Sequence, residues 1–162
     1  MFPAPKYGTI NNVGQKMTDK EYSGELRYAD GSISYHAGHS TWSLPVEEIR
    51  LIAEYTNSDG PHLDDYFLVF MTAAENGWHE ASFYAKGRDT VLSALSAMLG
   101  SPIECGLCDS VEYKTRILWP AHLKDQPLMD IIPSPKQNWW QKVTDSGARV
   151  LQLSAAARRA FK

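Results

Sequence analysis

Hydrophobic and polar positions are hardest to interpret in SLPVEEIRLIAEYT, which occupies residues 43–56. Proline followed by two glutamates is typical of a helix start, because proline fits the first turn and acids favour its positive end. The residue before the proline is Leu44 rather than Ser, Thr, Asp or Asn, however, so the expected cap is missing. Over residues 49–56, seven of eight positions fit a period of two, with Ile52 the exception. The pattern therefore predicts a corner followed by a strand, whose polar face holds Arg50, Glu54 and Thr56.

The clearest local pattern is YSGELRYADGSISYH, residues 22–36, which alternates on both sides of the dipeptide Asp30-Gly31. An Asp-Gly pair favours a tight type I′ turn, because both central residues of that turn need a positive φ. Centring the loop there predicts the antiparallel pairs Ala29–Ser32, Tyr28–Ile33, Arg27–Ser34 and Leu26–Tyr35. In this register the four large apolar side chains share one face of a hairpin.

Two further strands and a helix follow from the next apolar runs. Residues 66–73 are almost continuously apolar, which is typical of a central strand covered on both faces. Residues 78–85 follow an Asn-Gly turn signal and are expected to pair with that strand. The apolar spacing of residues 89–99 predicts an amphipathic helix that is capped by Asp89 and ends at Gly100.

The last third of the chain carries shorter patterns. Residues 110–120 include a strand-like run, residues 127–132 are short and apolar, and residues 133–140 are typical of a connector. From Asp145 or Ser146 onward the pattern predicts a C-terminal helix, with cations at its negative end. Its apolar stripe comprises Val150, Leu153, Ala157 and Phe161.

Together these elements predict an α+β protein built on a bent antiparallel sheet or sandwich. An irregular lead-in occupies residues 1–20, and a single core domain occupies residues 21–132. A connector and a basic helix follow over residues 133–162. No internal repeat or low-complexity tract interrupts this order.

The predicted order of six strands and a helix resembles the pleckstrin-homology-like (PH-like) domains of bacteria. In that family a corner of small apolar, Pro or polar, acidic and Ile residues leads into the fourth strand. The matching residues here are Leu44, Pro45, Glu47, Glu48 and Ile49. The resemblance spans about residues 22–99, and the family has seven strands before its helix. It implies a bent barrel plugged by helix 89–99, in a class of domains that mostly bind or assemble rather than catalyse.

Composition is that of a soluble globular protein, with 43% hydrophobic and 22% charged residues in a chain of 162. No apolar run reaches the 18 residues typical of a membrane span, and no secretory signal begins the sequence. Two cysteines do not make a disulfide scaffold. A reduced, cytoplasmic protein without a cofactor is therefore expected.

The net charge of −3 hides a strong asymmetry. Residues 136–162 hold six cations and one acid, a charge of +5, which leaves −8 for residues 1–135. Such a basic tail can bind a second copy of the chain, another acidic partner, or an acidic lipid or nucleic acid surface. The competing interpretation is a solvated helix face docked on its own body. Lipid headgroup binding at the first hairpin is not favoured, because Arg27 is its only cation.

The sequence CGLC, with Cys105 and Cys108, has the spacing of a redox pair or of half a zinc site. A redox pair usually precedes a helix, whereas the predicted helix here comes before it. A zinc site needs a second pair of ligands, and the chain has no other cysteine. Two ordinary cysteines remain the competing interpretation.

Three histidines and two aspartates form a second candidate for metal binding, and one for acid–base chemistry. His36 and His39 follow the first hairpin, and His62, Asp64 and Asp65 precede the central strand. The alternative is that all five are solvated loop residues. No nucleophile elbow, P-loop, HExxH or GxGxxG motif accompanies them.

Tandem Trp139 and Trp140 stand just before the basic segment that contains Arg149, Arg158 and Arg159. They suit an interaction surface that takes up lipid or bases, or a clamp that holds the C-terminal helix on the body. The sequence thus favours a non-catalytic binding or assembly module that contacts protein, including its own copies. A small hydrolase using the His/Asp group, and a tail that binds acidic lipid or nucleic acid, are the two alternatives.

Overall fold

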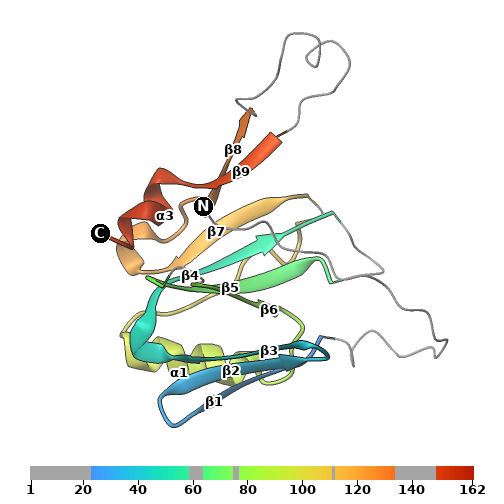
Figure 1. The fold of residues 1–162 in the computed structure, drawn as a ribbon, viewed down its shortest axis with the longest axis vertical. Helices are drawn as coiled ribbons and strands as arrows, with labels where there is room; N and C mark the ends of the chain where they lie inside the picture. The colour runs from blue at the N-terminus through green and yellow to red at the C-terminus, as the bar shows by residue number, and fades with distance from the viewer. Residues whose placement is uncertain (1–22, 59–63, 75–76, 111, 134–148) are drawn as a thin grey trace, which may run out of the picture.

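The computed structural model describes residues 23–58, 64–74, 77–110, 112–133 and 149–162. Figure 1 shows how the strands and helices are arranged in space. The strands are β1 (Glu25–Ala29), β2 (Ser32–Ala37), β3 (Ser40–Pro45), β4 (Ile49–Thr56), β5 (Tyr66–Thr72), β6 (Trp78–Ser82), β7 (Lys114–Trp119), β8 (Met129–Pro133) and β9 (Arg149–Leu153). The helices are η1 (Val46–Glu48), α1 (Arg88–Leu99), η2 (Ala121–Leu123) and α3 (Ala155–Arg159).

The strands form three separate antiparallel sheets. Sheet A has the order β1-β2-β3, sheet B has the order β6-β5-β4-β7, and the third sheet is a two-stranded ribbon of β8 and β9. Figure 1 shows sheet A and α1 below sheet B, with the C-terminal elements above it. The α+β class with antiparallel sheets is therefore confirmed, although the sheets do not close into a barrel.

The first hairpin has the predicted register. Ala29 pairs with Ser32, Tyr28 with Ile33, Arg27 with Ser34 and Leu26 with Tyr35. Asp30 and Gly31 have φ values of 49° and 76°, so both occupy the left-handed region that the type I′ turn requires. Leu26, Ile33 and Tyr35 are buried in the core, whereas Tyr28, the fourth member of the predicted apolar face, is 37% exposed.

The strand predicted over residues 49–56 is β4, and the corner before it is the short helix η1. The assignment of its faces was wrong in one respect. The register shifts between Ile49 and Leu51, so Ile49 joins Ile52 on the side of sheet A while Leu51 and Ala53 face the opposite way. Both faces are covered, and Glu54 is buried rather than solvated.

Helix α1 ends at Gly100 as predicted, but it begins one residue earlier than expected. Gly87 occupies the N-cap position, and Asp89 lies in the first turn, where its carboxylate accepts from Arg88. Asp89 is therefore not the cap. The buried stripe of the helix packs into the core between the sheets and consists of Val91, Leu92 and Leu95.

Sheet B separates two hydrophobic cores. The core toward sheet A and α1 includes Leu26, Ile33, Ile52, Leu68, Phe70, Leu95 and Leu118. The core on the opposite face includes Leu51, Val69, Met71, Ile117, Leu123, Leu128, Ala156 and Ala157. Because β5 lies between β4 and β6 and has both faces in these cores, the prediction of a central strand is confirmed.

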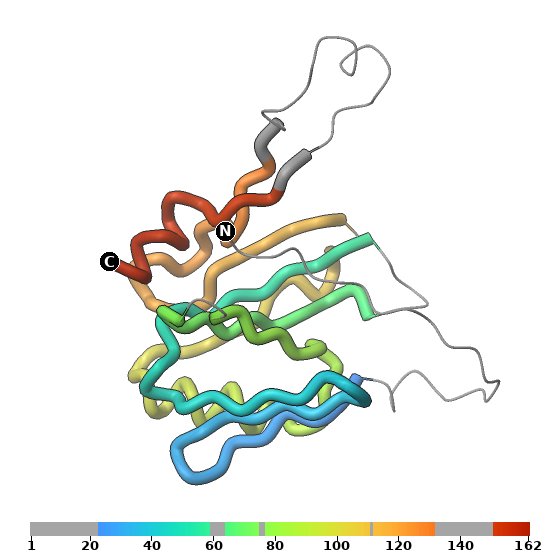
Figure 2. The backbone as a smooth tube through the Cα atoms, viewed as in Figure 1, coloured from blue at the N-terminus to red at the C-terminus, as the bar shows by residue number. Residues whose placement is uncertain are grey.

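The prediction of a C-terminal helix is wrong for most of its described length. Residues 149–153 form β9, which pairs with β8 from Met129–Leu153 to Pro133–Arg149, and only Ala155–Arg159 are helical. In the extended form the backbone groups of these five residues hydrogen-bond to β8, whereas a helix would leave β8 without a paired strand. The backbone trace in Figure 2 shows this ribbon standing off the body above sheet B.

Ser154 explains why the helix begins where it does. Its hydroxyl accepts from the Ala157 amide at 3.0 Å and donates to the Pro127 carbonyl at 2.6 Å, and the residue is buried. We expect Ser154→Ala to lower the free energy of unfolding by about 1–2 kcal/mol, because it removes the cap and the hydrogen bond to the Pro127 carbonyl. Ser40→Ala, at an exposed position in β3, is the control and is expected to change stability by less than about 0.5 kcal/mol in urea titrations. Equal effects of the two substitutions would contradict this role.

Candidate functional site

A fully buried carboxylate lies at the centre of the molecule. Glu54, on β4, has 0% of its surface exposed and is the only buried acid among the described residues. Its neighbours come from β5, from β7 and from the loop that follows α1. A buried ionised group must be paired and hydrogen-bonded to be tolerated, so its contacts define its role.

Both oxygens of Glu54 are occupied. The Arg116 guanidinium donates from Nε to Oε1 at 2.7 Å, and its Nη2 also lies 2.7 Å from Oε1. The Tyr66 hydroxyl donates to Oε2, and the Gly106 amide is shared between the two oxygens at 3.1 and 3.2 Å. The carboxylate therefore acts as a fixed anchor with no oxygen left for a substrate.

The anchor holds the loop of residues 104–107 against sheet B. Arg116 also donates to the Glu104 carbonyl at 2.9 Å, and the Leu107 amide donates to the Tyr66 hydroxyl at 3.2 Å. A Cβ atom at Gly106 would lie 2.6 Å from Arg116 Nη2, so a larger residue there would displace the guanidinium from its present position. We call Glu54, Tyr66, Gly106 and Arg116 the Glu54 latch.

The latch changes the chemistry of the groups beside it. Burial first, and then the nearby Glu54 carboxylate, disfavour the thiolate of Cys105 and together raise the pKa of its thiol to about 12. Burial also raises the pKa of Tyr66, whose hydroxyl donates to Glu54 only while it is protonated. Both groups are therefore neutral at physiological pH.

A shallow groove of about 370 Å³ runs beside the latch. The Phe83 ring lies between Tyr66, with ring centroids 3.8 Å apart, and the Arg88 guanidinium, 3.9 Å from its centroid. Arg88 already pairs with Asp89 and donates to the Phe83 carbonyl. The groove is lined by Phe83, Arg88, Asp89, Leu92, Ser93, Ser96, Ile103 and Cys105. The charge of Arg88 is compensated by Asp89, so the groove offers no free cation to a ligand.

The predicted CGLC pair lies in the loop that the latch holds. Both cysteines are free thiols, Cys105 half-buried and Cys108 exposed. A redox-active cysteine needs a lowered pKa, whereas that of Cys105 is raised. Among the described residues, no group of three His, Cys, Asp or Glu side chains is arranged to hold a metal ion.

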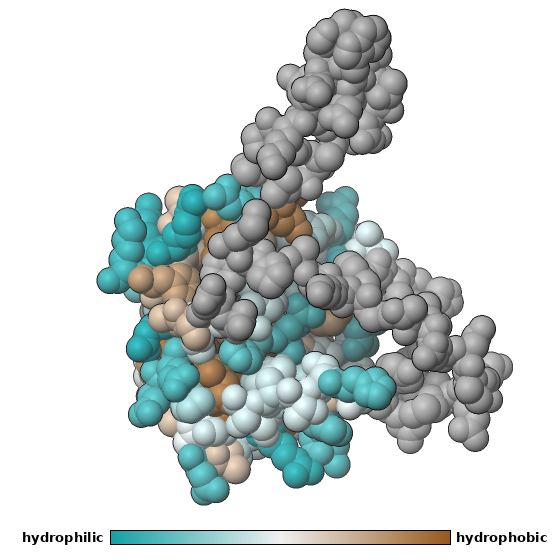
Figure 3. Space-filling view, viewed as in Figure 1, coloured by the Kyte–Doolittle hydropathy of each residue, from teal (hydrophilic) through white to brown (hydrophobic). Residues whose placement is uncertain are grey.

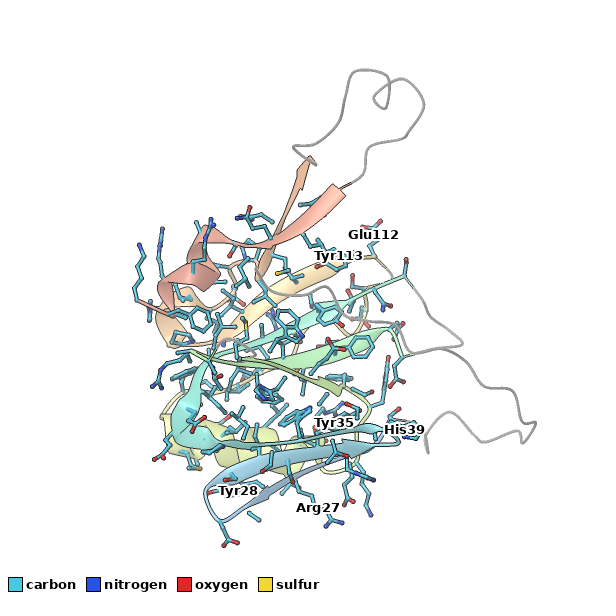
Figure 4. All side chains as sticks on the ribbon, viewed as in Figure 1. Arg27, Tyr28, Tyr35, His39, Glu112 and Tyr113 are labelled. Carbon is cyan, nitrogen blue, oxygen red and sulfur yellow. The ribbon has the colours of Figure 1, made fainter. Side chains whose placement is uncertain are left out.

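The predicted His/Asp group is divided among separate partners. His36 shares a hydrogen bond of 2.7 Å with Thr41, whereas Asp64 accepts from Ser23 at 3.1 Å and Asp65 from Tyr84 at 2.9 Å. His39 is exposed at the turn between β2 and β3, at one end of sheet A in Figure 4. His62 lies outside the described residues. Each described member thus has a local partner or faces solvent, and the group stays a prediction.

The ribbon presents two half-exposed apolar side chains that the sequence did not single out. Ile131 and Leu151 form a cross-strand pair, and each has 48% of its surface exposed. The next pair on the same face, Met129 and Leu153, packs against the core beneath. The apolar face of the ribbon is therefore continuous with the core and extends beyond it.

The predicted interaction residues lie close to this ribbon in the chain. Arg149 begins β9, and Arg158 and Arg159 are exposed in the last turn of α3. Trp139 and Trp140 lie outside the described residues. Figure 3 shows hydrophobic surface at the foot of the ribbon, with hydrophilic residues toward the C-terminus beside it.

Comparison with known proteins adds no assignment. A scan against protein-family models, a search of curated proteins and a search of solved structures found no match to this chain. None of the helices in the described part of the chain has the length and apolar character that crossing a membrane requires. The function proposed below therefore depends on the geometry of the molecule.

Proposed function

We propose that the chain is a non-catalytic protein-binding module of PH-like architecture that acts through its β8–β9 ribbon. The observation that carries the proposal is the exposed pair Ile131 and Leu151, on a ribbon that stands off the body. A two-stranded ribbon alone is only marginally stable in water, and its open edges and apolar face attract other chains. A reducing compartment such as the cytoplasm suits the two free thiols.

The buried polar groups support binding rather than catalysis. A catalytic acid or base needs an atom free to reach a substrate, and both Glu54 oxygens are engaged within the protein. Arg116 is likewise committed, to Glu54, Asp125 and the Glu104 carbonyl. The latch therefore serves to fix the loop beside it, and we assign partner binding to the exposed apolar pair of the ribbon.

Photo-cross-linking in the native cells tests this proposal. Benzoylphenylalanine replaces Leu151 in one variant and Met98 in the other, because Met98 is 50% exposed on α1 and matches Leu151 in exposure. We expect a discrete cross-linked protein, identified by mass spectrometry, from position 151 and none from position 98. Absence of any adduct at position 151, or equal adducts at both positions, would contradict the proposal.

A further inference from the structure

Charge is divided unevenly between the C-terminal segment, residues 149–162, and the rest of the described chain. Residues 149–162 carry four cations and no acid, whereas the described residues from 23 to 133 carry seven cations and fourteen acids. None of the ion pairs among the described residues includes Arg158, Arg159 or Lys162. These three cations are exposed and so remain available to an acidic partner. We call Arg158, Arg159 and Lys162 the basic end.

A matching acidic surface lies on the same molecule. The Val46 amide donates to the Gly31 carbonyl at 2.9 Å, which holds helix η1 against the turn of the first hairpin. This contact brings η1, which contains Glu47 and Glu48, next to the turn that contains Asp30, and all three acids are exposed. None of them forms an ion pair within the described part of the chain. We call Asp30, Glu47 and Glu48 the acidic corner.

The basic end and the ribbon form one connected element. Ser154 joins β9 to α3, and its amide donates to the Leu128 carbonyl just before β8. Cations and the exposed pair Ile131–Leu151 are therefore carried together by the C-terminal part of the chain. Apolar contact supplies affinity in an interface, and complementary charge supplies orientation and partner choice.

We infer that the partner of the ribbon is a second copy of this chain, with the basic end of each copy against the acidic corner of the other. The inference rests on the proposed function and names its partner. Three free cations and three free acids make the surfaces complementary in charge, and a two-fold axis lets both contacts form at once. A surface of phosphates would satisfy the basic end but would leave the acidic corner unused.

A charge-swap experiment on the purified full chain tests the inference. The first variant carries Arg158→Glu and Arg159→Glu, and the second carries Glu47→Lys and Glu48→Lys; all four side chains are exposed. Sedimentation is measured at protein concentrations up to about 200 µM, in low and in high salt. We expect the wild type to dimerise, each variant alone to dimerise at least about tenfold more weakly, and their equimolar mixture to recover the dimer.

Recovery in the mixture is specific to self-assembly. A dimer of either variant alone places like charges together at both contacts, whereas the mixed dimer joins opposite charges at both. The Met98→Asp variant controls for general surface effects and should dimerise as the wild type does, while Ile131→Asp with Leu151→Asp should not. A monomeric wild type, or a mixture that stays monomeric, overturns the inference. So does a monomer that binds phosphatidylglycerol vesicles or DNA through the basic end. If position 151 then cross-links to a different protein in cells, the proposed function stands although its partner is not the chain itself.

Discussion

Replacement of Arg116 by methionine is expected to lower the free energy of unfolding by about 3–5 kcal/mol at neutral pH, and the melting temperature by roughly 6–20 °C. The cause is the position of Glu54, which has 0% of its surface exposed and receives two of its strongest donors from Arg116. Without the guanidinium, the buried Glu54 carboxylate keeps only the Tyr66 hydroxyl and the Gly106 amide as hydrogen-bond donors. Urea titration monitored by circular dichroism measures the loss.

Lys124→Met provides the matched control for this loss. Lys124 and Arg116 have similarly exposed side chains, 29% and 25%, but the partner of Lys124 is the exposed Glu104 at 3.6 Å. A surface pair contributes about 0–1 kcal/mol, so the control should be nearly neutral. The double variant Glu54→Leu, Arg116→Met removes the stranded charge and should recover at least about 1 kcal/mol. A cost for Arg116→Met no larger than that of Lys124→Met would disprove the anchoring role of the latch.

The hairpin and β4 were predictable because their signals are local. The positive φ of Asp30 and Gly31 is set within the turn itself, and a turn fixes the register of every pair that follows. The corner and strand at residues 46–56 likewise follow from a period of two. Where both faces of a strand are covered by other elements, alternation of apolar and polar residues no longer predicts which side chains are buried.

Glu54 shows this limit. Its place among polar positions predicted a solvated face, whereas sheet A, α1 and the loop after α1 cover that face. Ile52 was the available signal, because an apolar residue on the supposed polar side indicates that this side is buried too. The partners of Glu54 lie 12, 52 and 62 residues away, and no local pattern specifies contacts at such separations.

The C-terminal segment was misassigned for a related reason. Residues 149–153 have a helix-compatible apolar spacing, but β8 offers them hydrogen-bond partners that only the tertiary structure reveals. Tertiary pairing overrides intrinsic propensity in such cases. The exposed Ile131–Leu151 pair could not be found from sequence, because it exists only once these strands are paired.

The two cysteines of CGLC are expected to differ strongly in reactivity. In the folded protein at pH 8, iodoacetamide should alkylate Cys108 at least about 100-fold faster than Cys105. Cys108 is exposed, whereas Cys105 is half-buried and has a pKa of about 12. At pH 8 a thiol with that pKa is ionised in only about one molecule in 10⁴, and the thiolate is the reacting species. Peptide mass spectrometry over a time course measures both rates.

The direction of the pH and mutational effects follows from the causes of the raised pKa. Burial comes first and the Glu54 carboxylate second, and both disfavour the thiolate. Below pH 12 the labelling rate of Cys105 should therefore rise about tenfold per pH unit, for as long as the fold persists. Glu54→Gln should lower the pKa of Cys105 and speed its labelling at fixed pH, while Glu104→Gln, at an exposed neighbouring position, should not. Equal labelling of the two cysteines in guanidinium confirms that the folded environment is the cause; equal labelling in the native protein would show that the latch does not shield Cys105.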